Sequence, residues 1–478
     1  MANLLRLLLS LGLLTALSNS QAIELPTKPN FILIMADNLG YGDIGPFGNK
    51  LNRTPNLDRM AREGRKLTSF YSASGVCTPS RAALMTGCYP RRVGLDWVPE
   101  DGHVLRPVSP NGLHPNEITI AEILKKVGYA TACIGKWHLG DQPEFLPTRQ
   151  GFDYFLGLPY SDDMTHATGQ RIGERLRGNQ WPPLPWMENE KVIEAPTDRN
   201  QMTQRETAAA LKFIATNKDK PFFLYLPHNM PGSSQQPFSS EHFRGKSKNG
   251  AWGDAVEELD WAVGQIFTAL KKHKIDERTL VIWTSDNGAP RRNPQKGSNG
   301  PLGGWGYTTA EGGMRVPCII RWPGFVPANS FSDELCSLMD LHPTFAKLAN
   351  TQLPARKRDG KNIWPLWSQP KAKTPHDFFY YYHSRYLEAV RDSNWKLYFP
   401  HSPDQPVRKG TKRRQQPVLI KVKTDIAEKE NVAVQHPEIV EHLTQAAQIA
   451  RSDLGQGIQK GTNVRPVGRV ENTTPRIK

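Results

Sequence analysis

Apolar runs of strand length alternate with helical patterns along most of this chain. Four runs are continuous, as in strands that are buried on both faces of a sheet, and they cover residues 30–36, 129–134, 221–226 and 279–284. Apolar residues at helical spacing occupy residues 55–63, 118–127, 208–215 and a long segment at 256–270, for which Asp254 is the expected N-cap. This alternation predicts an α/β fold with a mainly parallel central sheet and helices on both faces.

A different pattern occupies the last third of the chain. Residues 287–317 are rich in glycine and predict a loop, residues 340–349 predict a helix, and the prolines of residues 359–375 indicate a linker. Three short apolar segments separated by turns then predict an antiparallel meander, at residues 378–382, 387–391 and 395–399, and a late helix at 439–450 is expected to cover it. We therefore expect a large domain at residues 23–375 and a small C-terminal α+β domain at residues 376–478.

The four predicted strands all end in side chains that can bind a metal ion or transfer a proton. These side chains are Asp37 and Asn38, Lys136 and His138, His228, and Asp286 with Asn287. Ligands of such sheets bind beyond the carboxyl ends of the strands, so we expect these residues to line one site. Any single ending has a plainer interpretation as turn chemistry or as an exposed charge, and the agreement of four endings favours a site.

The first 22 residues have the pattern of a secretory signal peptide, with Arg6, an apolar run and small residues at the end. The apolar run is shorter than the ~20 residues that span a bilayer. We therefore expect an exported protein with no stable membrane anchor, which is periplasmic or secreted, or lysosomal or extracellular if the source is eukaryotic.

The chain carries a formal net charge of +15 and five cysteines. A positive surface suits nucleic acid, but export argues against that partner, and the same charge attracts sulfated, anionic substrates. A late basic run is predicted to be a solvated loop; it consists of Arg408, Lys409, Lys412, Arg413 and Arg414. The odd number of cysteines is consistent with one thiol that is reserved for chemistry.

Cys77 is the strongest candidate for that thiol. It begins the stretch Cys77-Thr78-Pro79-Ser80-Arg81, which runs into the apolar start of a predicted buried helix. The helix N-terminus and Arg81 are both expected to lower the pKa of the Cys77 thiol and make it a nucleophile. The alternative is that Cys77 only packs, since cysteine is among the most buried residue types, and these five residues do not decide between the two.

Cys-x-Pro-x-Arg, followed by Gly87, Tyr89 and Pro90, resembles the signature of the type I sulfatases, which are alkaline-phosphatase-like proteins. The resemblance runs through the whole large domain and includes the phrase Gly-Lys-Trp-His-Leu-Gly at residues 135–140. It implies that a formylglycine-generating or other sulfatase-maturing enzyme oxidises Cys77 to formylglycine. One hydroxyl of the aldehyde hydrate would attack the sulfur of a sulfate ester, and the other would later expel sulfate. Residues 161–196 are expected to form a loop that resembles arylsulfatase-like members and sets specificity.

The resemblance also assigns roles to the strand ends. It maps four residues onto calcium ligands, beside the modified Cys77, and these are Asp37, Asn38, Asp286 and Asn287. Their carboxylate and amide oxygens suit calcium, whereas zinc prefers nitrogen and sulfur. Arg81, Lys136 and His138 match the residues that hold and deprotonate the formylglycine hydrate.

Three positions depart from the family pattern. Asn38 replaces an aspartate, which should weaken calcium binding without abolishing it. Gly232 stands where relatives have a histidine that serves the leaving oxygen, and His228 aligns outside the core set. Gly306 stands where relatives have a sulfate-binding lysine.

Each lost donor is typically worth ~3 kcal/mol of transition-state stabilisation. We hypothesise that Lys296, ten residues upstream of Gly306, replaces them, and Arg291 and Arg292 lie nearby.

The sequence thus predicts an exported, calcium-dependent sulfatase acting on a sulfated small molecule or glycan, with an aryl or carbohydrate sulfate ester as its target. A phosphodiesterase or phosphonate hydrolase on the same fold is a second interpretation. A third is a degenerate sulfatase-like protein that only binds sulfated glycans. The missing lysine and histidine favour the third interpretation, and the intact motif from Cys77 to Arg81 argues against it.

Overall fold

The computed structural model describes residues 26–165, 181–234, 236–292, 296–407 and 412–478. The predicted signal peptide at residues 1–22 lies outside the described residues, as do Arg408 and Lys409 of the basic run. Among the described residues, no helix combines the length and the apolar character that crossing a bilayer requires.

Ten strands of the described residues form the main sheet, in the order β12-β2-β11-β10-β1-β9-β5-β6-β7-β8. Their bounds are β1 Asn30–Asp37, β2 Arg65–Leu67, β5 Ala130–Lys136, β6 Tyr154–Leu158, β7 Trp186–Glu188, β8 Lys191–Glu194, β9 Phe222–Pro231, β10 Thr279–Ser285, β11 Cys318–Arg321 and β12 Ser330–Ser332. The five central strands from β10 to β6 are parallel, while β11, β7 and β8 join antiparallel. The mainly parallel sheet is therefore confirmed.

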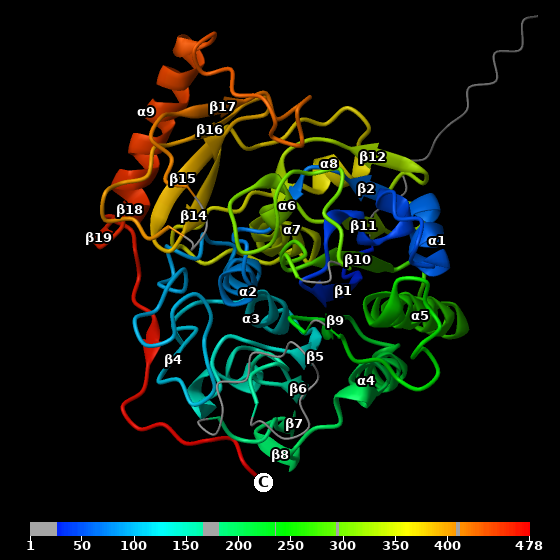
Figure 1. Cartoon of the computed structure of the whole chain (residues 1–478). Helices are drawn as coiled ribbons and strands as arrows, with labels where there is room; N and C mark the ends of the chain where they lie inside the picture. Colours follow the sequence, from blue (N-terminus) through cyan, green and yellow to red (C-terminus); the bar gives the residue numbers. More distant parts are fainter. Residues whose placement is uncertain (1–25, 166–180, 235, 293–295, 408–411) are drawn as a thin grey trace, which may run out of the picture.

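Helices cover both faces of this sheet (Figure 1). One face packs against α1 Pro55–Glu63, α4 Met202–Asn217 and α5 Gly250–Lys272, and the other against α2 Cys77–Thr86, α3 Ile120–Lys125 and α7 Leu341–Leu348. The strand β1 is buried on both sides because its apolar residues alternate: Phe31 and Leu33 belong to one core, and Ile32 and Ile34 to the other. The expected site lies at the edge of the sheet where the carboxyl ends of the parallel strands meet.

An antiparallel sheet follows near the C-terminus, as predicted, with four strands where three were expected. It contains β14 Phe379–His383, β15 Tyr386–Arg391, β16 Lys396–Tyr398 and β17 Val418–Ile420, and α9 Pro437–Leu454 packs on it. Its core includes Tyr71 and Met314 from the large region. The chain then returns along the large region, where β20 Gly468–Arg469 pairs with β4 Asn111–Gly112 (Figure 1).

Short elements complete the described chain. The remaining strands and α-helices are β3 Phe70–Tyr71, β13 Cys336–Ser337, α6 Glu311–Met314, α8 Trp364–Ser368, β18 Gly455–Gln456 and β19 Gln459–Lys460. Single 3₁₀ turns occur at Tyr41–Asp43, Gly45–Phe47, Pro143–Phe145, Pro147–Arg149, Arg199–Gln201 and Leu338–Asp340.

Some expectations about elements were wrong. The helix α5 begins at Gly250, so Asp254 is not its N-cap; instead its carboxylate accepts the N–H groups of Gly245, Lys246 and Ser247 in the preceding turn. The strand β9 continues through His228, because the chain stays paired with β1 after a bulge. The expected linker at 359–375 contains α8, and the expected loop at 161–196 contains β7 and β8, with its residues 166–180 outside the described residues.

Candidate active site

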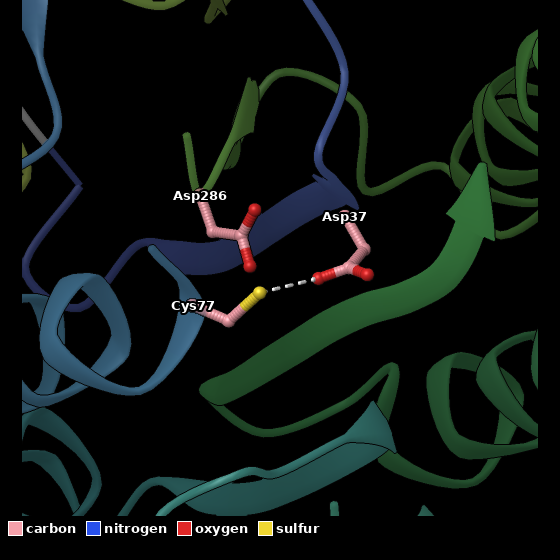
Figure 2. A group of neighbouring side chains, drawn as sticks. All are labelled: Asp37, Cys77 and Asp286. Atoms are coloured by element: carbon pink, nitrogen blue, oxygen red, sulfur yellow. Dashed lines mark hydrogen bonds between the residues drawn. The ribbon is translucent and has the colours of Figure 1, made fainter. Parts of the chain in front are cut away.

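The ends of β1 and β10 meet at the N-terminus of α2 (Figure 2). One ligand atom from each of Asp37, Cys77 and Asp286 lies within 4.8 Å of the other two, and all three residues are buried. The Cys77 thiol donates to Asp37 Oδ1 at 3.3 Å and lies 3.8 Å from Asn38 Oδ1. The two strand ends and the cysteine motif thus form one site.

The register of the parallel strands produces this convergence. Ala36 of β1 is paired with Ser285 of β10, so Asp37 and Asp286 follow at the same level. The chain then turns at Asn38, whose φ is 60° and whose backbone N–H donates to Asp286 Oδ1 at 3.0 Å. Asparagine tolerates this left-handed conformation better than most residues.

Two cations compensate the buried carboxylates. Arg81 donates to Asp286 Oδ2 at 3.0 and 2.8 Å, to Asp37 Oδ1 at 3.2 Å and to the carbonyl of Lys136 at 2.6 Å. Lys136 Nζ donates to Asp37 Oδ1 at 2.7 Å and to Ser161 Oγ at 3.1 Å. Burial acts to raise the pKa of Asp37, but Lys136 and Arg81 outweigh it and hold that pKa below its usual value. Burial and the nearby Asp37 raise the pKa of Asp286 to about 6.

The pKa expected for Cys77 was wrong. Burial, together with the charges of Asp286 and Asp37, raises the pKa of this thiol well above its usual value. The expectation considered only the helix terminus and Arg81, and Arg81 directs its hydrogen bonds to the two carboxylates and the Lys136 carbonyl instead. The unmodified thiol is therefore held in its neutral form in this environment.

His138 is placed to accept a proton. Its Nε2 lies 2.9 Å from the carbonyl of Leu105, which can only accept, so Nε2 carries the proton. Its Nδ1 is buried and has no hydrogen-bond partner among the described residues. Burial, Lys136 and Arg81 lower the pKa of His138 well below its usual value, so the ring is neutral with a free lone pair on Nδ1.

The residues present fit a calcium ion. Asp37 and Asp286 would supply carboxylate oxygens, Asn38 would supply an amide oxygen that also accepts from Asn287 Nδ2 at 2.6 Å, and the amide oxygen of Asn287 is buried without a partner in the described part of the chain. Calcium accepts carboxylate and amide oxygens in this way. A buried amide oxygen left unpaired is costly unless another group satisfies it.

Two other sequence candidates lie elsewhere. His228 is buried with its Nδ1 2.6 Å from Glu206 Oε2 of α4, and it does not line the cavity beside Cys77. The side chain of Lys296 is exposed, its carbonyl accepts from Asn249 Nδ2 at 3.0 Å, and it does not line that cavity either. The structure therefore brings neither residue to the thiol.

A cavity of about 480 Å³ opens beside Cys77. Its lining includes Cys77, His138, Ser161, Ser233, Tyr307 and His383, the last of which comes from the C-terminal sheet. The rings of His103 and His383 stack at its wall with their centroids 4.8 Å apart. Burial raises the pKa of Tyr307 to about 12, so its hydroxyl stays protonated.

Sequence reasoning missed Ser161, Ser233 and Tyr307. Ser161 follows β6 just as the predicted candidates follow their strands. Recognising residues 154–158 as a strand, and then looking for polar side chains after it, would have found Ser161. Ser233 and Tyr307 follow glycines in segments without a periodic pattern and carry no such signal.

A second cavity, of about 710 Å³, lies away from these residues. Its lining includes Glu63, Asp276 and Arg321, and Arg321 pairs with both acids, at 2.6 and 2.7 Å. The charged groups of this cavity are already paired with one another. We therefore place the candidate active site at the smaller cavity beside Cys77.

Comparisons with known proteins agree with this geometry. The family model described as Sulfatase matches residues 29–351, and the model of the C-terminal region of aryl-sulfatase matches residues 374–469. Steryl-sulfatase of Mus musculus is 38% identical over 445 residues, which cover 78% of this chain and 71% of that protein. Arylsulfatase A of Homo sapiens is 37% identical over 480 residues, which cover 94% and 92%. Among solved structures, the PsFucS1 sulfatase from Pseudoalteromonas sp. superposes with a TM-score of 0.76 at 28% identity, covering 91% of this chain and 92% of the other.

Proposed function

This chain belongs to the sulfatase family, and we propose that it is an exported, calcium-dependent enzyme that hydrolyses sulfate esters through a formylglycine made from Cys77. It is a sulfuric ester hydrolase, with aryl or carbohydrate sulfates as its substrate class. The observation that carries the proposal is the approach of Asp37, Cys77 and Asp286 to within 4.8 Å of one another, with Cys77 also lining a cavity.

The strand ends would hold the calcium ion. The proposed ligands are Asp37, Asn38, Asp286, Asn287 and the modified Cys77. When bound, the ion neutralises the charge of the sulfate group and polarises its bonds to sulfur. Arg81 and Lys136 hold Asp37 in place by donating to its Oδ1, at 3.2 and 2.7 Å.

The modification of Cys77 would be made by a sulfatase-maturing enzyme, which also supplies the oxidant. The formylglycine hydrate supplies a hydroxyl nucleophile where the thiol stands. His138 Nδ1 is the proposed acceptor of a proton from that residue, because it lacks another partner among the described residues and its ring is neutral. Lys136 lies 2.7 Å from Asp37 Oδ1, to which the Cys77 thiol also donates, so it is proposed to steady the negative charge that develops there.

The substrate is proposed to be a sulfated small molecule or glycan. Relatives are named steryl-sulfatase, arylsulfatase A and N-acetylgalactosamine-6-sulfatase, which supports this class. We propose no nucleic acid partner and no stable membrane anchor, with residues 1–22 as a signal peptide. The division into domains at residues 23–375 and 376–478 also stays a prediction.

A second candidate function is binding of sulfated glycans without hydrolysis. The observation that favours it is the presence of Gly232 and Gly306 where the family has cationic side chains. The phosphonate monoester hydrolase of Agrobacterium radiobacter, at 19% identity and a TM-score of 0.58, shares the fold alone, and a phosphodiesterase or phosphonate hydrolase stays an alternative interpretation.

Two measurements on protein produced with a maturing enzyme test these functions. Mass spectrometry of the Cys77 peptide should show sulfur and two hydrogens replaced by one oxygen. The same preparation should hydrolyse an aryl sulfate but not an aryl phosphate diester, and Cys77→Ala should abolish turnover. Turnover of the phosphate diester alone would favour a phosphodiesterase or phosphonate hydrolase, and a modified protein that binds but never cleaves sulfate esters would favour a binding protein.

A further inference from the structure

The two glycines that replace family cations lie where the backbone excludes a side chain. Gly232 has φ +72°, and a Cβ there would stand 2.9 Å from the carbonyl oxygen of Asn229. A Cβ on Gly306 would stand 2.3 Å from the carbonyl oxygen of Gly288. This backbone therefore has no room for the missing histidine or lysine, and the next residue along the chain, Ser233 or Tyr307, faces the cavity in each case.

Backbone hydrogen bonds fix both of these next residues beside the site. The N–H of Gly232 donates to the carbonyl of Asp37 at 3.0 Å, which holds Ser233 near the predicted calcium ligands. The N–H of Tyr307 donates to the carbonyl of Gly75 at 2.9 Å, two residues before Cys77. Tyr307 has φ 68°, an uncommon conformation for a tyrosine that surrounding structure must enforce.

The two hydroxyls meet in one hydrogen-bonded chain. Ser233 Oγ lies 3.2 Å from the Tyr307 hydroxyl. Asn38 Nδ2 donates to Ser233 Oγ at 3.0 Å, and Arg292 Nη2 donates to the Tyr307 hydroxyl at 3.4 Å. The guanidinium also donates to the carbonyl of Ser233 at 3.1 and 2.8 Å, which fixes its position.

Counting the protons of this chain leaves one donor for a ligand. Ser233 and Tyr307 carry two O–H protons, and their mutual hydrogen bond uses only one of them. Each oxygen already accepts an N–H from outside the pair, from Asn38 or from Arg292. Whichever hydroxyl donates within the pair, the other O–H has no acceptor among the described residues, and both residues line the cavity that contains Cys77.

We propose that the hydrogen-bonded pair of Ser233 and Tyr307 donates its remaining O–H to an oxygen of the substrate sulfate, in place of the histidine and lysine that positions 232 and 306 lack. Arg292 and Asn38 are positioning residues. Arg292 places its positive charge beside the Tyr307 hydroxyl, and Asn38 orients the Ser233 hydroxyl. An aspartate at position 38 has no N–H to donate, so the three departures from the family pattern form one coordinated change. The proposal rests on the proposed function and names the sulfate-binding part of that site.

The test uses the matured, calcium-loaded protein and four variants: Tyr307→Phe, Ser233→Ala, Arg292→Gln and Arg292→Lys. Turnover of 4-nitrophenyl sulfate gives kcat and KM, and calorimetry in a Cys77→Ala background gives the affinity for inorganic sulfate without chemistry. We expect Tyr307→Phe to lower kcat/KM about 100-fold, mainly through kcat, and to weaken sulfate binding about tenfold. Ser233→Ala should act in the same direction.

Arg292 should act through Tyr307. Arg292→Gln is therefore expected to lower kcat/KM about tenfold alone but to add little in a Tyr307→Phe background, while Arg292→Lys should recover part of the loss. Arg291→Gln is the matched control, because Arg291 is exposed and adjacent, and it should stay within about twofold of the parent.

The outcomes separate this proposal from the proposed function. Parent-like turnover and parent-like sulfate affinity in both Tyr307→Phe and Ser233→Ala would overturn the proposal while leaving the sulfatase intact. A parent protein that binds sulfate through Tyr307 without cleaving the ester would support the proposal and overturn the hydrolytic function. Absence of sulfate binding by the calcium-loaded parent would overturn the proposal.

Discussion

Two buried groups of charged side chains in this molecule differ in how completely their hydrogen bonds are satisfied. The strand-end cluster is formed by Asp37, Arg81, Lys136, His138, Asp286 and Asn287. The Glu311 cluster is formed by Tyr71, Glu311, Tyr381, Arg391 and Lys396, and it lies between the large region and the C-terminal sheet. Both are almost free of solvent contact, so burial alone does not distinguish them.

We call the Glu311 cluster closed because its polar side-chain atoms are hydrogen-bonded. Glu311 Oε1 accepts from Tyr381 and Lys396, each at 3.0 Å, and Oε2 accepts from Tyr71 at 2.5 Å. Arg391 donates in turn to the Tyr71 hydroxyl. Within the described residues, no side-chain polar atom of this cluster lacks a partner. Such a cluster fixes how two parts of a chain pack together.

We call the strand-end cluster open because two of its buried polar atoms lack a hydrogen-bond partner in the described ranges. These atoms are His138 Nδ1 and Asn287 Oδ1. Unpaired buried polar atoms cost about 1–3 kcal/mol each, so each of them calls for an explanation, such as a ligand, a reaction or an ordered water. The two clusters thus differ in hydrogen bonding rather than in buried charge, while single unpaired buried atoms also occur elsewhere in the described chain, for example at Gln150 and Trp367.

The largest expected effect comes from Asp37→Asn in the open cluster. This change removes the carboxylate that both Lys136 and Arg81 hold and that is proposed to bind calcium. We expect kcat/KM to fall by more than about 1,000-fold. Calcium at 100 times its Kd should stabilise the parent by about 2.7 kcal/mol and the variant by much less, as measured by thermal unfolding with and without the ion. Equal calcium stabilisation in both proteins would contradict the assignment of Asp37 as a ligand.

Glu311→Ala, in the closed cluster, should lower the stability of the protein and leave its activity nearly unchanged. It removes one carboxylate from a buried network in which Lys396 keeps Glu428 as a partner, with Oε1 at 2.9 Å, so the cost should lie near the lower end of the about 3–5 kcal/mol that breaking a buried pair typically costs. We expect that loss in the free energy of unfolding, measured with denaturant, while kcat/KM per folded molecule stays within about threefold.

The double variant Glu311→Leu with Lys396→Met is the control. Replacing both partners by apolar side chains of similar size should recover part of the lost stability. A stability no better than that of Glu311→Ala would show that the pair itself was not the cause.

The closed cluster also predicts an acid-sensitive stability. Burial acts to raise the pKa of Glu311, but Lys396, Arg391 and Arg315 outweigh it and lower the pKa from 4.5 to about 2. Because the folded state has the lower pKa, this stabilisation is complete above about pH 4.5 and is lost as the pH falls towards 2. We expect it to amount to about 3 kcal/mol. Denaturant unfolding at several acidic pH values gives the free energy of unfolding as a function of pH. This free energy should fall less steeply with decreasing pH for Glu311→Gln than for the parent, and an equal dependence on pH would refute the prediction.

The sequence predicted the open cluster better than the closed one. Asp37, Lys136 and Asp286 were found because each follows a continuous apolar run long enough to be recognised as a strand. Glu311 and Lys396 have no such local signal, since they meet only when the C-terminal sheet packs on the glycine-rich loop. Strands of three residues, such as β2 and β12, were missed because they are too short to show a period.

Local reasoning also misjudged groups whose neighbours come from distant segments. Cys77 was assessed by its own helix and Arg81, but Asp37 and Asp286 decide its pKa, and they lie 40 residues before it and far after it in the chain. Likewise Ser233 and Tyr307 are 74 residues apart in sequence. Only the register of the parallel sheet and the path of the loops bring such residues together.

The smallest expected effect, Asn38→Asp, changes the open cluster in two directions. The added carboxylate should tighten calcium binding about tenfold, since ligand charge tunes calcium affinity. The same change removes the Nδ2 donor to Ser233 Oγ and should loosen sulfate about threefold, a typical loss for one neutral hydrogen bond. Titrating calcium by thermal unfolding and sulfate by calorimetry separates the two effects. Asn38→Ala is the matched control, because it lacks both the charge and the donor and should weaken both ligands. If Asn38→Asp instead tightened sulfate binding together with calcium, position 38 would act only through the ion, and its contact with Ser233 would have no part in holding the substrate.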